Sequence, residues 1–221
     1  MAAEIRDIAI FTTFAALAAT AVMLVPGVAV AWLLARRSFR GKAIVETLVS
    51  LPLVIPPVAT GLLLLWLFSP RGPFGSLLQR AGIEVVFTPA AVVIAMAVMG
   101  LPLLVRTARA GFEQVTRRYE QIAETLGAGP WRVFSTVTLP LASRNILAGA
   151  VLGFSRALGE FGATIVVAGS IPGRTRTLAV GIYSFAETGQ DRQAAVLLVI
   201  SISIAFVAVL ASNRLAREAQ A

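Results

Sequence analysis

The chain has 221 residues, of which 57% are hydrophobic and only 14% are charged, whereas about a quarter of the residues in soluble domains are charged. It contains neither histidine nor cysteine, which excludes Ser-His-Asp triads, thiol nucleophiles and His/Cys metal sites. Its single lysine, Lys42, precedes an alanine; the chain therefore has no P-loop, and ATP chemistry would have to come from another subunit.

Five apolar segments, taken in chain order, are candidates for membrane-spanning helices. They cover residues 8–34, 44–68, 90–105, 146–168 and 194–211. The first is expected to be a retained helix, because the acidic Glu4 and Asp7 deprive the leading segment of the positive region of a signal peptide. Little sequence remains for a soluble domain. We therefore predict an all-α membrane protein built as a five-helix transmembrane bundle.

The basic residues predict the orientation of this bundle in the membrane. Twelve of the 19 lysines and arginines lie in alternate connections: Arg36, Arg37, Arg40, Lys42, Arg106, Arg109, Arg117, Arg118, Arg132, Arg144, Arg214 and Arg217. The positive-inside rule then predicts a multi-pass protein of the inner cell membrane, with its N-terminus outside and its C-terminus in the cytoplasm. Since the charge is dispersed among loops, we expect no nucleic-acid partner.

The second span contains Pro52, Pro56 and Pro57. Each proline removes a backbone donor and kinks a helix. Broken helices are tolerated at membrane depth where they are buried in protein or line a cavity. We therefore interpret this span as a helix of a transport pathway, with Pro56 and Pro57 at the break.

Residues 113–144 form a charged connection between the third and fourth spans. Tyr119, Ile122 and Leu126 recur at helical spacing and give one apolar face. Gly127 can end this helix in the left-handed conformation, and Pro130 suits the first turn of a second helix. We predict a short helical hairpin that lies on the membrane surface and docks a soluble partner. An ordinary amphipathic connector is the alternative.

The fourth span contains Arg156 and Glu160, one helical turn apart. The spacing allows an ion pair, which would offset part of the cost of placing charges in the membrane. The pair either stabilises helix packing or lies beside a transport pathway, where Arg156 would attract an oxyanion and Glu160 would limit its affinity. Gly153, Gly159 and Gly162 are expected to allow close helix packing.

The segment 169–192 is predicted to lie outside the membrane. Pro172-Gly173 marks a turn, two arginines follow it, and residues 178–186 have the pattern of an amphipathic helix. A solvated basic loop and a contact surface for another protein are both consistent with this pattern.

Four segments carry a resemblance to a known family: residues 50–57 (SLPLVIPP), 125–134 (TLGAGPWRVF), 158–164 (LGEFGAT) and 171–177 (IPGRTRT). The nine residues between Gly127 and the sequence VTLP at 137–140 add to it. Together they resemble the permease subunits of type I ABC importers, most of all the molybdate permeases. The resemblance runs from about residue 27 to residue 215, and it implies a type-1 ABC transmembrane domain over residues 8–215.

The resemblance also implies roles for individual residues. An ATPase-coupling loop would include Glu120, Gln121, Ala123, Glu124, Gly127, Ala128 and Pro140. The charges and breaks within the spans, rather than the resemblance, give the candidates for the translocation path and its gate: Pro56, Pro57, Arg156, Glu160 and Gly162. Where the family pattern is Glu-Ala-Ala, this chain has Gln-Ile-Ala at 121–123, so Glu120 or Glu124 would supply the leading polar contact.

The partners implied by the resemblance are a second copy of the permease, two ATP-binding cassette subunits and an extracytoplasmic molybdate-binding protein. ATP would be bound by the cassette subunits, and this chain would need no cofactor or metal and would not itself be an enzyme. A sulfate or tungstate permease of the same family is an alternative. A secondary transporter and a membrane scaffold belong to other classes; the first should show ion-coupling residues or an internal repeat, which the sequence lacks.

Overall fold

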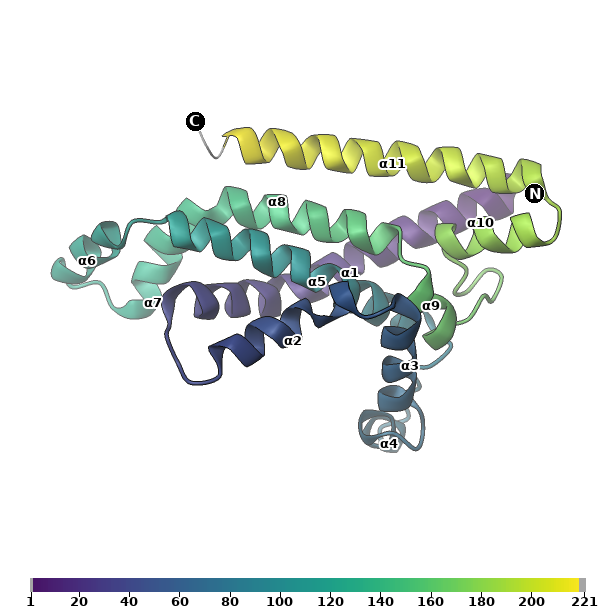
Figure 1. The fold of residues 1–221 in the computed structure, drawn as a ribbon, viewed down its shortest axis with the longest axis horizontal. Helices are drawn as coiled ribbons and strands as arrows, with labels where there is room; N and C mark the ends of the chain where they lie inside the picture. Colours follow the sequence, from purple (N-terminus) through teal and green to yellow (C-terminus); the bar gives the residue numbers. More distant parts are fainter. Residues whose placement is uncertain (1, 219–221) are drawn as a thin grey trace.

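The structure is a computed structural model that describes residues 2–218, all of whose regular elements are helices (Figure 1). In chain order these are α1 (Ala2–Arg36), α2 (Lys42–Val54), α3 (Pro57–Phe68), α4 (Pro73–Arg80), α5 (Pro89–Gln114), α6 (Arg117–Thr125), α7 (Pro130–Val133), the π-helix η1 (Phe134–Thr138), α8 (Leu139–Leu158), α9 (Gly162–Val167), α10 (Leu178–Glu187) and α11 (Asp191–Glu218). The predicted all-α class is confirmed.

Helix α5 forms the centre of the bundle and packs most extensively against α8 and α1. Small residues allow the close approach of α5 to α8, because a Cβ atom on Gly100 would lie 2.8 Å from the carbonyl oxygen of Gly153. On its other side, α8 packs against α11 (Figure 1). The packed core is therefore shared by α1, α5 and α8.

Four helical stretches within the described residues are long and apolar enough to cross a membrane: α1, α5, Pro130–Leu158 and α11. The pair α2 and α3 becomes a fifth if it is counted as one span, but it is bent by 115°. The bend has a local cause. Ile55 and Pro56 each precede a proline, which disfavours the helical conformation, and both are extended, with ψ of 144° and 133°.

The fourth span differs from its predicted bounds at both ends. Its helix begins at Pro130, because α7, η1 and α8 are continuous, and it ends at Leu158. Pro140 lies inside this stretch, and the π-helix just before it carries a bond from Leu139 N–H to the carbonyl of Phe134. A proline disrupts the regular α-helical ladder, and a π-helical turn changes the register at that point. The second helix of the predicted hairpin is thus the start of a span.

Two of the connections lie at opposite ends of the molecule, and α4 projects from its side (Figure 1). One end holds α6 and α7, together with the C-terminal part of α11. The other end holds α9, α10 and the beginning of α1. The charged connection at residues 113–144 and the segment at residues 169–192 are therefore far apart.

Candidate functional site

Helix α6 ends in a glycine turn. Gly127 has a φ of 85°, the left-handed region that favours glycine. Its N–H donates to the carbonyl of Glu124, and the N–H of Ala128 donates to the carbonyl of Ala123, at 2.9 and 3.0 Å. These two bonds form a Schellman motif. The predicted glycine stop is confirmed, and Pro130 begins the next helix as expected.

The turn presents an exposed apolar surface, which we call the docking surface: Tyr119, Ile122, Leu126 and Trp131. Leu126 is 83% exposed and Trp131 77%. The polar side chains of Gln121 and Glu124 are exposed beside it, whereas Ala123 and Ala128 are half-buried. An apolar patch with a polar rim at the end of a molecule is typical of a protein-binding site.

Glu120 points away from this surface, into the molecule. Its Oε1 atom lies 2.9 Å from Nη2 of Arg36, at the end of α1, and forms an ion pair with it. The same oxygen accepts a 2.7 Å hydrogen bond from the hydroxyl of Thr138 in η1. The side chains of Arg36 and Glu120 are 10% and 17% exposed. Of the two acids that the sequence offered for a partner contact, Glu124 is the exposed one.

An aromatic cluster holds the second half of the hairpin. The ring of Phe134 lies 5.7 Å from that of Trp32 in α1, 6.4 Å from Phe112 in α5 and 5.6 Å from Trp131, measured between centroids. Offset and edge contacts at such distances are favourable. Through Phe134, the docking surface is therefore packed against α1 and α5 as well as against its own helices.

The predicted pair of Arg156 and Glu160 is confirmed. Nη1 of Arg156 lies 2.7 Å from Oε2 of Glu160, and their side chains are 26% and 1% exposed. The sequence analysis placed Glu160 within a helix, and this was wrong. Glu160 lies in the break between α8 and α9. Its Oε1 atom accepts a 2.7 Å hydrogen bond from the backbone N–H of Ala163. Glu160 thus joins the end of α8 to the first turn of α9.

The break after α8 meets the break between α2 and α3. A Cβ atom on Gly162 would lie 2.7 Å from Cβ of Pro57, and one on Gly61 would lie 2.8 Å from Cα of Ala163. Gly162 therefore provides the predicted close packing, as does Gly153. Gly159 does not, because a Cβ atom there would meet nothing within 4 Å. The structure thus brings Pro57, Gly162 and the Arg156–Glu160 pair into one region, with Pro56 next along the chain.

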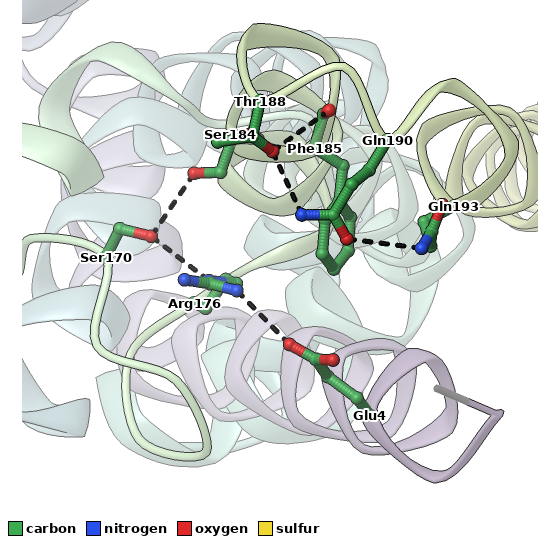
Figure 2. Close-up of polar contacts among 8 residues, drawn as sticks. All are labelled: Glu4, Ser170, Arg176, Ser184, Phe185, Thr188, Gln190 and Gln193. Atoms are coloured by element: carbon green, nitrogen blue, oxygen red, sulfur yellow. Dashed lines mark hydrogen bonds and ion pairs between the residues drawn. The ribbon is translucent and has the colours of Figure 1, made fainter.

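The opposite end of the molecule contains a polar cluster around Arg176 (Figure 2). Its Nη1 atom lies 3.2 Å from Oε1 of Glu4 in α1, and its Nε donates to the hydroxyl of Ser170 at 3.2 Å. The guanidinium also lies over the ring of Phe185, 5.7 Å from the centroid. The predicted helix after this segment is present as α10.

The sequence did not predict three residues that make contacts between distant segments. Arg36 and Thr138 bind the carboxylate of Glu120, and Thr12 binds the backbone of α10. The hydroxyl of Thr12 in α1 accepts a 2.8 Å hydrogen bond from the N–H of Leu178, the first residue of α10. Arg36 and Glu120 are 84 positions apart, and Thr12 and Leu178 are 166 apart. No spacing rule for a single helix or turn reaches that far.

Comparisons with known proteins identify what this fold resembles. Residues 27–218 match the family of binding-protein-dependent transport system inner membrane components. The molybdenum transport system permease protein ModB of Escherichia coli K12 is 48% identical over 193 residues, which cover 86% of this chain and 84% of that protein. The Haemophilus influenzae ModB is 44% identical over the same shares. The E. coli sulfate transport system permease protein CysT is 37% identical over 81% of this chain and 66% of that protein.

Solved structures agree on the fold. A chain of the methionine ABC transporter MetNI, in an inward-facing conformation, matches with a TM-score of 0.67 at 16% identity, covering 99% of this chain and 95% of that one. A chain of a bacterial ABC transporter that imports the polysaccharide alginate matches with a TM-score of 0.64 at 18% identity, covering 95% and 79%.

Proposed function

This chain belongs to the family of binding-protein-dependent transport system inner membrane components, and from that premise we propose that it is the permease subunit of an ATP-driven importer for molybdate. The observation that carries the proposal is the 48% identity to a molybdenum transport permease over 86% of the chain. The lower identity to a sulfate permease, 37%, makes sulfate the second candidate. Tungstate, a tetrahedral dianion like molybdate, is the third.

The hydrolysis of ATP belongs to a partner, because this chain has no P-loop lysine. Two ATP-binding cassette subunits would take part, one for each of two permease copies. Each would bind the docking surface formed by α6 and its turn. There Gln121 and Glu124 offer exposed polar groups, Gly127 and Ala128 form the turn, and the carbonyl of Ala123 accepts the hydrogen bond from Ala128 that closes it. Because Pro130–Leu158 is one helical stretch, a displacement of the turn by the ATPase would move η1, Pro140 and α8 with it.

A second copy of the chain would complete the path. Helices α1, α3 and α11 carry many exposed apolar side chains, among them Phe14, Trp66 and Phe206. Lipid covers some of these faces, and a homodimer would enclose a path that one thin bundle cannot. An extracytoplasmic molybdate-binding protein would deliver the cargo at the end that holds α10. A transporter similar in fold has been solved with a substrate-bound periplasmic protein.

The gate of this path would lie where the break between α2 and α3 meets the break between α8 and α9, at Pro56, Pro57, Gly162 and the Arg156–Glu160 pair. A partly exposed guanidinium attracts an oxyanion, and the neighbouring carboxylate keeps the site from binding it too tightly for release. The domain would comprise residues 8–215, with the N-terminus outside and the C-terminus in the cytoplasm, as the distribution of arginines predicts.

Uptake by whole cells tests the cargo. Cells that express this chain with its ATPase and binding-protein partners should accumulate molybdate, and cells that lack only this chain should not. Added tungstate and sulfate then rank the alternatives by competition. Accumulation of sulfate that molybdate does not inhibit would contradict the proposed cargo. The mass of the detergent-extracted permease tests the homodimer, which a single-copy mass in the assembled complex would contradict.

A further inference from the structure

Helix α1 runs through the molecule from one end to the other. It is continuous over 35 residues, with Pro26 inside it, and at 1.5 Å per residue it is about 52 Å long. That length exceeds the roughly 30 Å hydrocarbon core of a bilayer. Both ends of α1 can therefore extend beyond the apolar core, and they reach the two ends of the molecule, one near α6 and α7 and the other near α10 (Figure 1).

The inner end of α1 is tied to the docking surface by Arg36. Its Nη2 atom donates to the carbonyl of Val115, just before α6, and pairs with Glu120 inside α6, both at 2.9 Å. Glu120 in turn accepts from Thr138. Because the Arg36 and Glu120 side chains are largely buried, the contact is strengthened by exclusion of water. The end of α1, the α6 helix and η1 are thus joined through one ion pair.

The outer end of α1 is tied to the start of α10 by the hydroxyl of Thr12. The hydroxyl of Thr12, which is buried, accepts from the N–H of Leu178 at 2.8 Å and donates to the carbonyl of Ile8. A second contact, more exposed on the α1 side, joins α1 to the segment before α10: the side chain of Glu4, which is 44% exposed, pairs with Arg176 (Figure 2). Since the Thr12 contact caps the first backbone donor of α10, it fixes the start of that helix to α1.

We propose that α1 is a strut that couples the outer segment around α10 to the ATPase-docking helix α6, with Thr12 and Arg36 as its positioning residues. The inference rests on the proposed function, in which a binding protein acts on one end and an ATPase on the other. A continuous element that is anchored at both ends can pass displacement between them, and its effect is a coupling free energy between two sites.

A strut has a distinctive signature, because its two ties act in series. Breaking either tie should abolish the same coupling, so breaking both should do no further harm. Two independent structural contacts would instead give losses that multiply. The measurable quantity is the ratio of ATP hydrolysis with and without the molybdate-loaded binding protein, in the full complex reconstituted in lipid.

Two variants break the ties with little change of shape. Thr12→Val removes the outer acceptor and keeps a β-branched side chain. The pair Arg36→Met with Glu120→Gln removes the inner ion pair without leaving a buried charge. Each should lower the stimulation ratio at least about fivefold, the lower end of common coupling factors. The triple variant should lose no more than the worse of the two.

Matched controls separate coupling from damage to the fold. Thr13→Val changes a neighbouring hydroxyl that bonds to Ala9 within its own helix, and Arg37→Met changes the exposed neighbour of Arg36; both should keep the ratio of the unchanged chain. Thr12→Ser retains the acceptor and should restore the coupling that Thr12→Val loses, which a loss of folded protein would not do.

The outcomes distinguish the two claims. If the unchanged chain assembles and is stimulated, but Thr12→Val and the inner variant keep full stimulation, the strut is wrong and the proposed function stands. Multiplying losses in the triple variant overturn the strut as well. If the unchanged chain neither assembles with an ATPase nor responds to the binding protein, the proposed function fails and the strut fails with it.

Discussion

Gly162 of α9 lies against Pro57 of α3 so closely that a Cβ atom on Gly162 would be 2.7 Å from Cβ of Pro57 and 3.1 Å from the backbone nitrogen of Val58. Pro57 is the first residue of α3, after the break that follows α2. Gly162 is the first residue of α9, after the break that follows α8. The two helix breaks therefore support each other, at the position that we propose for the gate.

Gly162→Ala should disturb this contact. Because the nearest atoms belong to a proline ring and a backbone, they have little room to move, and overpacking of this kind costs about 1–3 kcal/mol. We expect less folded protein after detergent extraction and a lower rate of molybdate uptake per folded molecule. Gly159→Ala is the control, because the added methyl group would meet nothing within 4 Å. Equal behaviour of the two variants would refute the close contact.

The Arg156–Glu160 pair should show non-additive effects. Glu160→Gln leaves Arg156 without its charge partner, at a cost below the ~3–5 kcal/mol of a fully buried pair because Arg156 is 26% exposed. Adding Arg156→Gln should restore part of the folded protein. Uptake by the double variant then separates the roles: normal transport means that the pair only packs, and a folded protein that stalls or leaks places it at the gate. Additive losses would show that the pair contributes nothing as a pair.

Gly127→Val should uncouple the docking surface. With a φ of 85° at this position, a β-branched residue would be strained by about 1–2 kcal/mol or would unwind the turn. We expect near-normal insertion, weak association with the ATPase and loss of uptake. Gly129→Val is the control, since Gly129 has an ordinary φ of −69° and open space around it. Full uptake by Gly127→Val would remove the role proposed for the turn.

The orientation is tested by labelling, because the chain has no native cysteine. Gln121 and Gln190 are both exposed, so a cysteine at either position is accessible to solvent. A membrane-impermeant thiol reagent added to intact cells should label position 190 and leave position 121 unlabelled until the cells are opened. The reverse pattern would place the docking surface outside, where no ATPase could reach it.

Local features of the site could be predicted from the sequence, because their physical cause spans only a few residues. The Arg156–Glu160 pair follows from one helical turn, and the Gly127 turn follows from the conformational freedom of glycine. The proline pair likewise predicted a break in the second span. Its 115° bend was not predictable, since the angle depends on how α3 packs against α9.

The remaining features depend on contacts between distant segments. Hydropathy set the fourth span at residues 146–168, but the helix starts at Pro130 and ends at Leu158, because hydropathy records polarity and not the continuity of the backbone. The inward turn of Glu120 depends on Arg36, which lies 84 positions away. On α6 alone, Glu120 and Glu124 are equivalent acids one turn apart.

The most direct test of the central claim is molybdate uptake into proteoliposomes that contain this chain, its ATPase subunits and its binding protein. Uptake should require ATP inside the vesicles, should stop when the ATPase is omitted, and should be unaffected when ion gradients are collapsed. Uptake that continues without the ATPase but disappears with the ion gradient would identify a secondary transporter and contradict the account.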